Sequence, residues 1–137
     1  MHYKLFDHTA DLGVDFFGVT REALFRHAAL SLFDLLVEAR DVRDIENREV
    51  RIEGADGTDL FVNYLREMLY LFNGEGRVLT DCRILRMDDR ELTAEVRCGR
   101  FDASRHRIRT EIKAVTYHLA SLSETPQGWT GRIILDV

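Results

Sequence analysis

The residues with the most evident chemical potential lie in one short segment near the start of the chain, Asp7–Gly13, with the sequence DHTADLG. The segment holds two carboxylates, an imidazole and a hydroxyl, and it falls at a predicted break between two strands. Oxygen-rich clusters of this kind suit a hard cation such as Ca²⁺ or Mg²⁺ when more distant oxygens complete the coordination shell. The alternative is turn chemistry, in which Asp and Thr cap backbone groups and His8 forms a local hydrogen bond. Taken alone, the segment favours the turn.

The last residues of the chain change that balance, because they offer further oxygens. The predicted final strand is apolar until Asp136, and Val137 adds a main-chain carbonyl and a terminal carboxylate. A cation there would meet two negative groups. A frayed, solvated terminus is the ordinary alternative. An apolar strand that continues this far is typical of a terminus held in a sheet, so the sequence predicts that the chain end is an ordered part of the site.

Lys113 is the second candidate for chemistry. Lysine occurs only at Lys4 and Lys113, and every other one of the 19 basic residues is an arginine. In a strand, Lys113, Val115 and Tyr117 would share one face, and His118 would lie on the other. The lysine ammonium is a compact cation that binds phosphate or pairs with a carboxylate. The alternative is that codon bias alone explains the scarcity of lysine.

A locally basic stretch lies just upstream of Lys113. It could receive RNA phosphates or an acidic partner surface, although a solvated charged loop is the ordinary interpretation of such a run. Its basic residues are Arg97, Arg100, Arg105, His106, Arg107 and Arg109, and Asp102 interrupts them. The whole chain has 19 basic and 24 acidic residues, a net charge of −5, so bulk attraction to nucleic acid or anionic lipid is disfavoured.

Two helices and several strands must position these groups. The sequence predicts two short strands from Tyr3 to Gly18, a helix from the cap residue Thr20 to about Glu38, and a strand around Val50 and Ile52 after a charged connector. A second helix begins at a cap, either Asp56 or Thr58, and ends at Asn73-Gly74. Further strands are predicted over residues 77–87, 91–99, 112–123 and 129–137, with a turn at 88–90.

Both predicted helices are apolar over more than one narrow stripe, which indicates that they are covered on two sides. The sequence therefore predicts an α+β fold, one domain over residues 1–137, with two helices layered between β-sheets in a β/α/β three-layer arrangement. A chain of 137 residues can bury a core without disulfides. Cys82 and Cys98 are therefore predicted to be buried, reduced thiols.

Several classes of protein are excluded or disfavoured. The chain has no glycine-rich phosphate-binding motif and no serine nucleophile elbow. It has no apolar N-terminal signal segment and no run of the roughly 18 apolar residues that a membrane span needs. We therefore expect a soluble, cytoplasmic protein that does not bind membranes.

Taken together, these residues resemble the archease family. The resemblance runs essentially from residue 1 to residue 137, and two of its strings, DHTAD and IKAVTYH, are specific. The residues that carry it are Asp7–Gly13, Leu24-Phe25 in the first helix, Ile112–His118, and the terminal pair Asp136-Val137. The intervening helices match by pattern more than by identity.

The resemblance implies an accessory protein and not an enzyme. Archeases activate the tRNA-splicing RNA ligase, which joins RNA ends through a guanylylated histidine of its own and uses GTP and a metal. They promote its guanylylation and multiple turnover and broaden the nucleotides that it accepts, in tRNA splicing and RNA repair. The implied partner is this ligase, and any RNA contact is expected to be indirect.

The resemblance also implies roles for single residues. A divalent metal ion, usually Ca²⁺ in the family, would bind at Asp11, Asp136 and Val137. Lys113 falls in the motif linked to ligase activation, while His8 and His118 match the motifs and receive supporting roles only. No catalytic residue is expected in this chain.

Two other interpretations stay open at this point. The first is a metal-dependent hydrolase that uses Asp11, Asp136 and His8, with a metal-bound water as the nucleophile. The second is a purely structural ion site in an ordinary binding module.

Overall fold

Both helices begin where the sequence places a capping residue before an apolar repeat. The computed structural model describes residues 3–8 and 11–137, with residues 6–8 described by their backbone alone. Helix α1 (Arg21–Leu36) follows Thr20, whose hydroxyl accepts a hydrogen bond from the Ala23 amide at 3.0 Å. Helix α2 (Gly57–Asn73) follows Asp56, whose carboxylate accepts from the Asp59 amide at 2.8 Å. The first cap is confirmed, and the choice left open for the second is settled in favour of Asp56.

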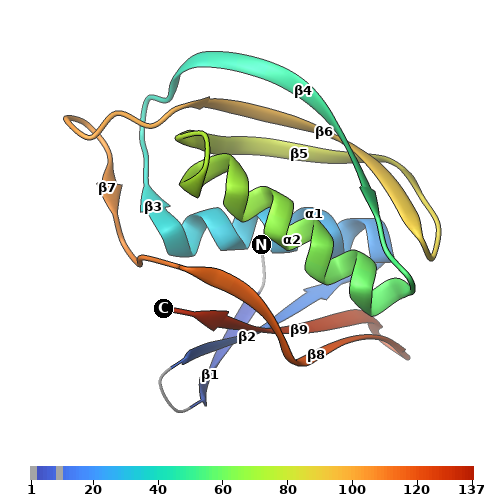
Figure 1. Cartoon of the computed structure of the whole chain (residues 1–137). Coiled ribbons are helices and arrows are strands. Elements are labelled where there is room, and N and C mark those ends of the chain that lie inside the picture. The colour runs from blue at the N-terminus through green and yellow to red at the C-terminus, as the bar shows by residue number, and fades with distance from the viewer. Residues whose placement is uncertain (1–2, 9–10) are drawn as a thin grey trace.

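A four-stranded antiparallel sheet covers one side of the helices. Its strands are β1 (Tyr3–His8), β2 (Asp11–Gly18), β9 (Gly128–Asp136) and β8 (Ala114–Thr125), in the order β1-β2-β9-β8. The strand break predicted around residues 9–11 falls between β1 and β2, but Thr9 and Ala10 themselves lie outside the described residues. In this sheet the second strand pairs with the last, so the start of the chain and its end lie side by side (Figure 1).

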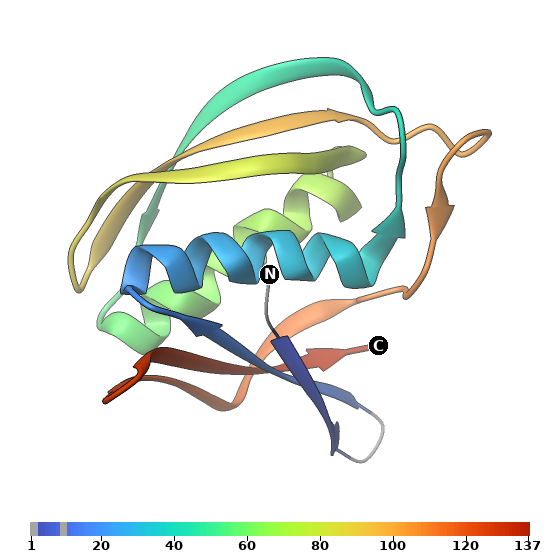
Figure 2. The same ribbon diagram turned by 180° about the vertical axis from the view of Figure 1, so that it is seen from behind.

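A three-stranded antiparallel sheet covers the other side. Its strands are β4 (Arg43–Glu53), β6 (Glu91–Arg100) and β5 (Arg77–Met87), in the order β4-β6-β5. Two short strands, β3 (Val37–Glu38) and β7 (Arg107–Ile108), pair with each other where the chain passes between the layers. Both helices lie between the two sheets (Figures 1 and 2), which confirms the predicted α+β, three-layer β/α/β fold.

The core lies on both faces of the helices. Phe61 and Tyr64 of α2 pack against Phe25 of α1, with ring centroids 5.0 and 5.1 Å apart. The Tyr64 hydroxyl donates to the Phe25 carbonyl at 2.9 Å, and it lies 3.2 Å from the Cys82 sulfur. Burial raises the pKa of Tyr64 well above its ordinary value, so this hydroxyl stays neutral and anchors α2 to α1.

Both cysteines are buried and unbridged, as predicted. In the β5–β6 pairing Cys82 lies opposite Val96, and Cys98 lies opposite Leu79. Burial raises the pKa of both thiols. Because the thiolate is the reactive form, these residues are suited to packing and not to metal binding or nucleophilic chemistry.

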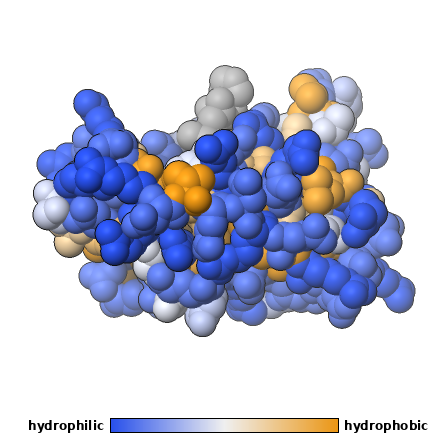
Figure 3. Space-filling model, turned by 90° about the horizontal axis from the view of Figure 1, so that it is seen from above, coloured by the Kyte–Doolittle hydropathy of each residue, from blue (hydrophilic) through white to orange (hydrophobic). Residues whose placement is uncertain are grey.

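The three-stranded sheet corrects one prediction, at the start of strand β4. The charged run read as a connector before Val50 is most of strand β4, which starts at Arg43. Its charged side chains form ion pairs, such as Arg48 with Glu75 at 2.9 Å and Arg51 with Glu91 at 3.0 Å. Seen from above, this side of the molecule is mostly hydrophilic, with only separate hydrophobic spots (Figure 3). The apolar alternation that marks a half-buried strand is missing from the start of β4, because Glu46 and Arg48, which pair with each other, occupy the face that Val50 and Ile52 share further on.

Among the described residues, neither helix is long and apolar enough to cross a membrane.

The two possible caps of α2 give a direct test of this helix start. Replacing Asp56 by Ala removes the acceptor for the Asp59 amide and should lower the free energy of unfolding by about 1 kcal/mol. Replacing Thr58 by Ala, two residues further on and inside the helix, should change it by less than about 0.5 kcal/mol. Urea unfolding of the two variants measures the difference. Equal losses would contradict the assignment of Asp56.

Candidate functional site

The strand register brings the two predicted metal-binding ends of the chain together. Leu12 of β2 pairs with Leu135 of β9, and the strands run antiparallel. Continuing this register by one residue puts Asp11 opposite Asp136, at the same end of the sheet as the β1–β2 connection and the C-terminus (Figure 1). The sequence separates these two aspartates almost completely, and the sheet makes them neighbours.

Strand alternation places both carboxylates on one face. Asp15 and Arg132 pair in the register and form a bidentate ion pair at 2.7 and 3.0 Å. Asp11 lies four residues before Asp15, and Asp136 lies four residues after Arg132, so both share the face of that ion pair. The intervening residues, such as Val14 and Leu135, are buried toward the helices. A cation bound between two carboxylates on the same outer face would interact favourably with both of them.

The described residues do not form a metal site from side chains alone. They contain no group of three or more His, Cys, Asp and Glu side chains that could hold a metal ion by themselves. Asp11 and Asp136 are both half-buried, and Val137, which directly follows Asp136, is exposed. This donor set fits a hard cation such as Ca²⁺ only if main-chain oxygens, the chain terminus or water complete the shell.

Lys113 lies at the same end of the sheet. Its amide donates to the Asp136 carbonyl at 2.7 Å. The predicted strand 112–123 in fact begins at Ala114, so Lys113 precedes it and does not continue its alternation. The reason is visible one residue earlier, where the Ile112 carbonyl accepts from the Asn73 side chain of α2 at 2.9 Å and not from a neighbouring strand.

The side chain of Lys113 is exposed and makes no ion pair with any acidic residue that the structure describes. Most of the arginines do make such pairs. Lys113 therefore presents a cation to solvent beside two carboxylates of the same sheet end.

The two histidines of the sequence motifs are placed differently. His8 pairs with Asp11 through the β1–β2 backbone, but its side chain lies outside the described part of the structure. His118 lies in an irregular part of β8, where pairing with β9 jumps from Thr116 to Ser121. Supporting roles for His8 and His118 stay predictions.

The irregular part of β8 is a bulge over residues 117–120. Leu119 adopts a left-handed backbone with φ of 54°, a conformation that is rare for a residue with a branched side chain. The exposed Tyr117 ring packs against the guanidinium of Arg66 on α2, 4.9 Å from its centroid. The Nε of Arg66 also donates to the Val115 carbonyl at 3.0 Å. Helix α2 therefore holds residues 112–115, which lead into β8, at two points, through Asn73 and Arg66.

The basic stretch upstream is largely neutralised within the fold. Arg105 pairs with Asp41 and Asp102 at 2.9 Å each, and Arg100 pairs with Asp44 at 3.3 Å. His106, read as part of a solvated loop, is buried instead. Paired arginines offer less to RNA phosphates than free ones, so the structure favours the structural interpretation of this stretch.

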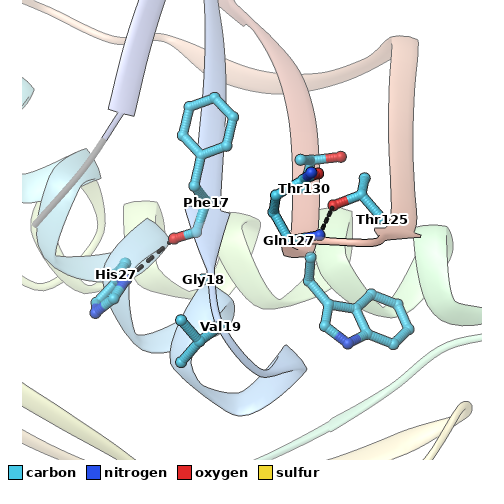
Figure 4. Close-up of a pocket in the computed structure, with 8 residues that line it drawn as sticks. Phe17, Gly18, Val19, His27, Thr125, Gln127 and Thr130 are labelled. Atoms are coloured by element: carbon cyan, nitrogen blue, oxygen red, sulfur yellow. Dashed lines mark hydrogen bonds between the residues drawn. The ribbon is translucent and has the colours of Figure 1, made fainter.

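An apolar pocket of about 380 Å³ lies at the opposite end of the four-stranded sheet (Figure 4). Phe17, Val19 and Trp129 give it apolar walls, and His27 is fixed there by a 3.0 Å hydrogen bond between its Nδ1 and the Phe17 carbonyl. Gly18 of β2 pairs with Trp129 of β9, whereas the carboxylates lie at the other ends of these strands. The pocket is thus separate from the candidate metal site.

The sequence analysis missed Arg66 and Asn73 as parts of this site. Asn73 is predicted from the sequence only as part of the stop signal of the second helix, and no role is predicted for Arg66. A signal was available, because both lie on one face of α2 seven residues apart. The strand segment that they contact could not be located without the fold.

The fold and this site define a class: small α+β proteins in which two helices lie between antiparallel sheets and the C-terminus is built into a sheet beside an early aspartate. The model of the archease protein family matches residues 3–137, and the chain belongs to this family.

Similar proteins align with this chain over nearly all of their length. Protein archease of Thermococcus gammatolerans is 37% identical over 141 residues, with 98% of each chain covered. Protein archease of Methanosarcina barkeri is 32% identical over 139 residues, covering 98% of this chain and 95% of that one. The solution structure of protein 1598 of Methanobacterium thermoautotrophicum is similar at a TM-score of 0.74 with 27% identity, and 98% of each chain is covered.

Proposed function

We propose that this chain is an accessory protein of the cytoplasm that activates the tRNA-splicing RNA ligase. It promotes guanylylation of the ligase by GTP, supports multiple turnover and broadens the nucleotides that the ligase accepts, in tRNA splicing and RNA repair. It is not itself an enzyme. Membership of the archease family supports this proposal. The observation that carries it is the hydrogen bond from the Lys113 amide to the Asp136 carbonyl, because this bond joins the proposed activating residue to a proposed metal ligand.

In this proposal a divalent ion, Ca²⁺ in the first instance, is held by Asp11, Asp136 and Val137. Bound there, the ion would supply positive charge that ties the second strand to the last one. The protein's own part is to hold the two aspartates on one face of the sheet, through the β2–β9 register and the Asp15–Arg132 ion pair. A pair of strands held in register is what a partner protein can recognise without ordering it first.

Lys113 would act on the ligase. Its exposed ammonium lies at the edge of the sheet, where it can approach a triphosphate or an acidic residue of the ligase active site. During guanylyl transfer, the negative charge on the phosphates of GTP changes in amount or position. A fixed cation placed beside that charge lowers the free-energy barrier of the transfer. The shape and charge of the sheet end therefore favour a role in which Lys113 acts on the ligase and not within its own chain.

The direct test is guanylylation of the ligase by labelled GTP, with and without this protein. Addition of the protein should raise the rate and the number of turnovers per ligase. The isolated protein should show no phosphatase or nuclease activity, with or without Ca²⁺ or Mg²⁺. Hydrolysis that depends on Asp11 and Asp136 would contradict the proposal and favour a metal-dependent hydrolase.

The ion site can be tested by calorimetry with Ca²⁺. Asp11→Ala and Asp136→Ala should each weaken binding, because a hard cation loses one anionic oxygen in each variant. Glu49→Ala is the matched control, since Glu49 is an exposed acidic residue on the far sheet and its loss changes the net charge equally. If both aspartate variants bind like the wild type, the proposed ligands are wrong.

The chain end can be tested with tags. A tag fused after Val137 removes the free carboxylate from its place beside Asp136, so Ca²⁺ affinity should fall if that carboxylate is a ligand. A tag of the same sequence at the N-terminus should have less effect. Equal affinities in the two proteins would remove the terminal carboxylate from the metal shell.

The role of Lys113 can be separated from folding. Lys113→Ala should change the free energy of unfolding by no more than about 0.5 kcal/mol, as is usual for exposed positions. It should slow single-turnover guanylylation at least about tenfold, which corresponds to roughly 1.4 kcal/mol of barrier. Lys113→Arg should recover only part of the rate, because a guanidinium differs in shape and hydration from an ammonium.

The other lysine provides the control for this measurement. Lys4 is exposed on β1, so Lys4→Ala removes the same charge without touching Lys113. Normal activation by Lys113→Ala would exclude this residue from the mechanism. An early melting transition together with poor activation would assign it a structural role instead.

A further inference from the structure

Helix α2 holds the segment around Lys113 through two side chains on one of its faces. The Asn73 side-chain amide donates to the Ile112 carbonyl at 2.9 Å, and the Arg66 Nε donates to the Val115 carbonyl at 3.0 Å. Both bonds are partly buried, and in both of them a main-chain carbonyl oxygen is the acceptor. The helix therefore contacts the backbone of this segment, whatever side chains it carries.

The spacing of the two donors matches the spacing of the two acceptors. Seven residues of an α-helix rise about 10.5 Å, and three residues of an extended chain rise about 10 Å. Asn73 follows Arg66 along the helix, while Ile112 precedes Val115 along the strand, so the two elements run in opposite directions. Lys113 lies between the two fixed carbonyls.

One peptide group receives the strongest constraint. The Ile112 carbonyl, which accepts from Asn73, and the Lys113 amide, which donates to Asp136, belong to the same peptide unit. A peptide unit is planar and its C=O and N–H point in opposite directions, so hydrogen bonds at both atoms leave it only the rotation about the line that joins them. The buried Ile112 side chain anchors it from the other side. The Lys113 Cα lies in that plane, so its position follows from the plane, and the Arg66 bond to the Val115 carbonyl restricts the chain on the other side of Lys113.

We propose that Asn73 is a positioning residue for Lys113: by holding the Ile112–Lys113 peptide between helix α2 and strand β9, it sets the direction in which the ammonium leaves the sheet toward the phosphates of the ligase's nucleotide. The proposal rests on the activating function proposed above. Asn73 does not touch the ligase or its nucleotide, and its effect is transmitted through Lys113. Arg66 holds the same segment three residues further on.

The helix offers a matched control for this residue. Asn63, ten residues earlier on α2, also donates its side-chain amide to a main-chain carbonyl, that of Glu53, at 2.9 Å. Asn63→Ala and Asn73→Ala therefore delete the same kind of bond from the same helix. A merely structural role of Asn73 predicts equal effects on melting temperature and on activation.

The test compares both variants of the full-length chain in single-turnover guanylylation at saturating concentrations of this protein. Both variants should melt a few degrees below the wild type. Asn73→Ala should slow guanylylation about fivefold, whereas Asn63→Ala should leave the rate unchanged. In a Lys113→Ala background, Asn73→Ala should cause no further loss, because its effect passes through the lysine that is already absent.

Two results would overturn the proposal: equal rates with Asn73→Ala and Asn63→Ala, or a loss from Asn73→Ala that adds in full to the loss from Lys113→Ala. Failure of the proposed activating function can be told apart from these two results, because the wild type would then not accelerate guanylylation at all. In that case, hydrogen exchange of the isolated protein tests whether Asn73 positions Lys113. Faster exchange of the Lys113 amide in Asn73→Ala than in Asn63→Ala supports the positioning, and equal exchange overturns it.

Discussion

The need to cover two helices on both sides determines most of this structure. Helices α1 and α2 carry buried residues around most of their circumference, including Phe25, Phe61 and Tyr64, which lie between the two sheets. One sheet can cover only one side of the helices. The chain therefore forms one sheet, passes the helix layer and forms a second sheet on the other side. The order of strands follows from this requirement. Strands from the beginning and the end of the sequence meet in one sheet, and the middle of the sequence forms the other.

Crossing the helix layer has a chemical consequence, because the segment that crosses delivers Lys113 to the chain end. Residues 101–113 pass the C-terminal ends of both helices, and aromatic rings line this passage: Phe33, Phe72, Phe101 and His106 form a series of contacts. The buried imidazole of His106 accepts from the Asp102 amide through Nδ1, so Nε2 carries the proton and donates to the Arg40 carbonyl. Contacts therefore hold the crossing segment as far as the peptide that Asn73 and β9 bind.

Local signals in the sequence predicted the local structure well. Thr20 caps the first helix because a hydroxyl there satisfies an otherwise unpaired amide, and that requirement can be read without the fold. The charged start of β4 was misread because the ion-paired Glu46 and Arg48 stand where apolar residues would be expected, on the face that Val50 and Ile52 share. The place of Lys113 outside β8 was also missed. It depends on the contact with Asn73, which joins residues 39 positions apart. Asp11 and Asp136 could be proposed as partners from the family resemblance, but only the register makes them neighbours.

The bulge in β8 has a further consequence, for the behaviour of the protein in solution. Strand β8 is an edge of the four-stranded sheet, and a long regular edge is a template on which other chains can add strands and start aggregates. Residues 117–120 interrupt the pairing with β9, and the left-handed turn at Leu119 bends the edge out of a regular ladder. An incoming strand would find two short pieces that are out of line with each other. The strand that carries the segment next to Lys113 is thus protected against uncontrolled self-association while its side chains stay accessible.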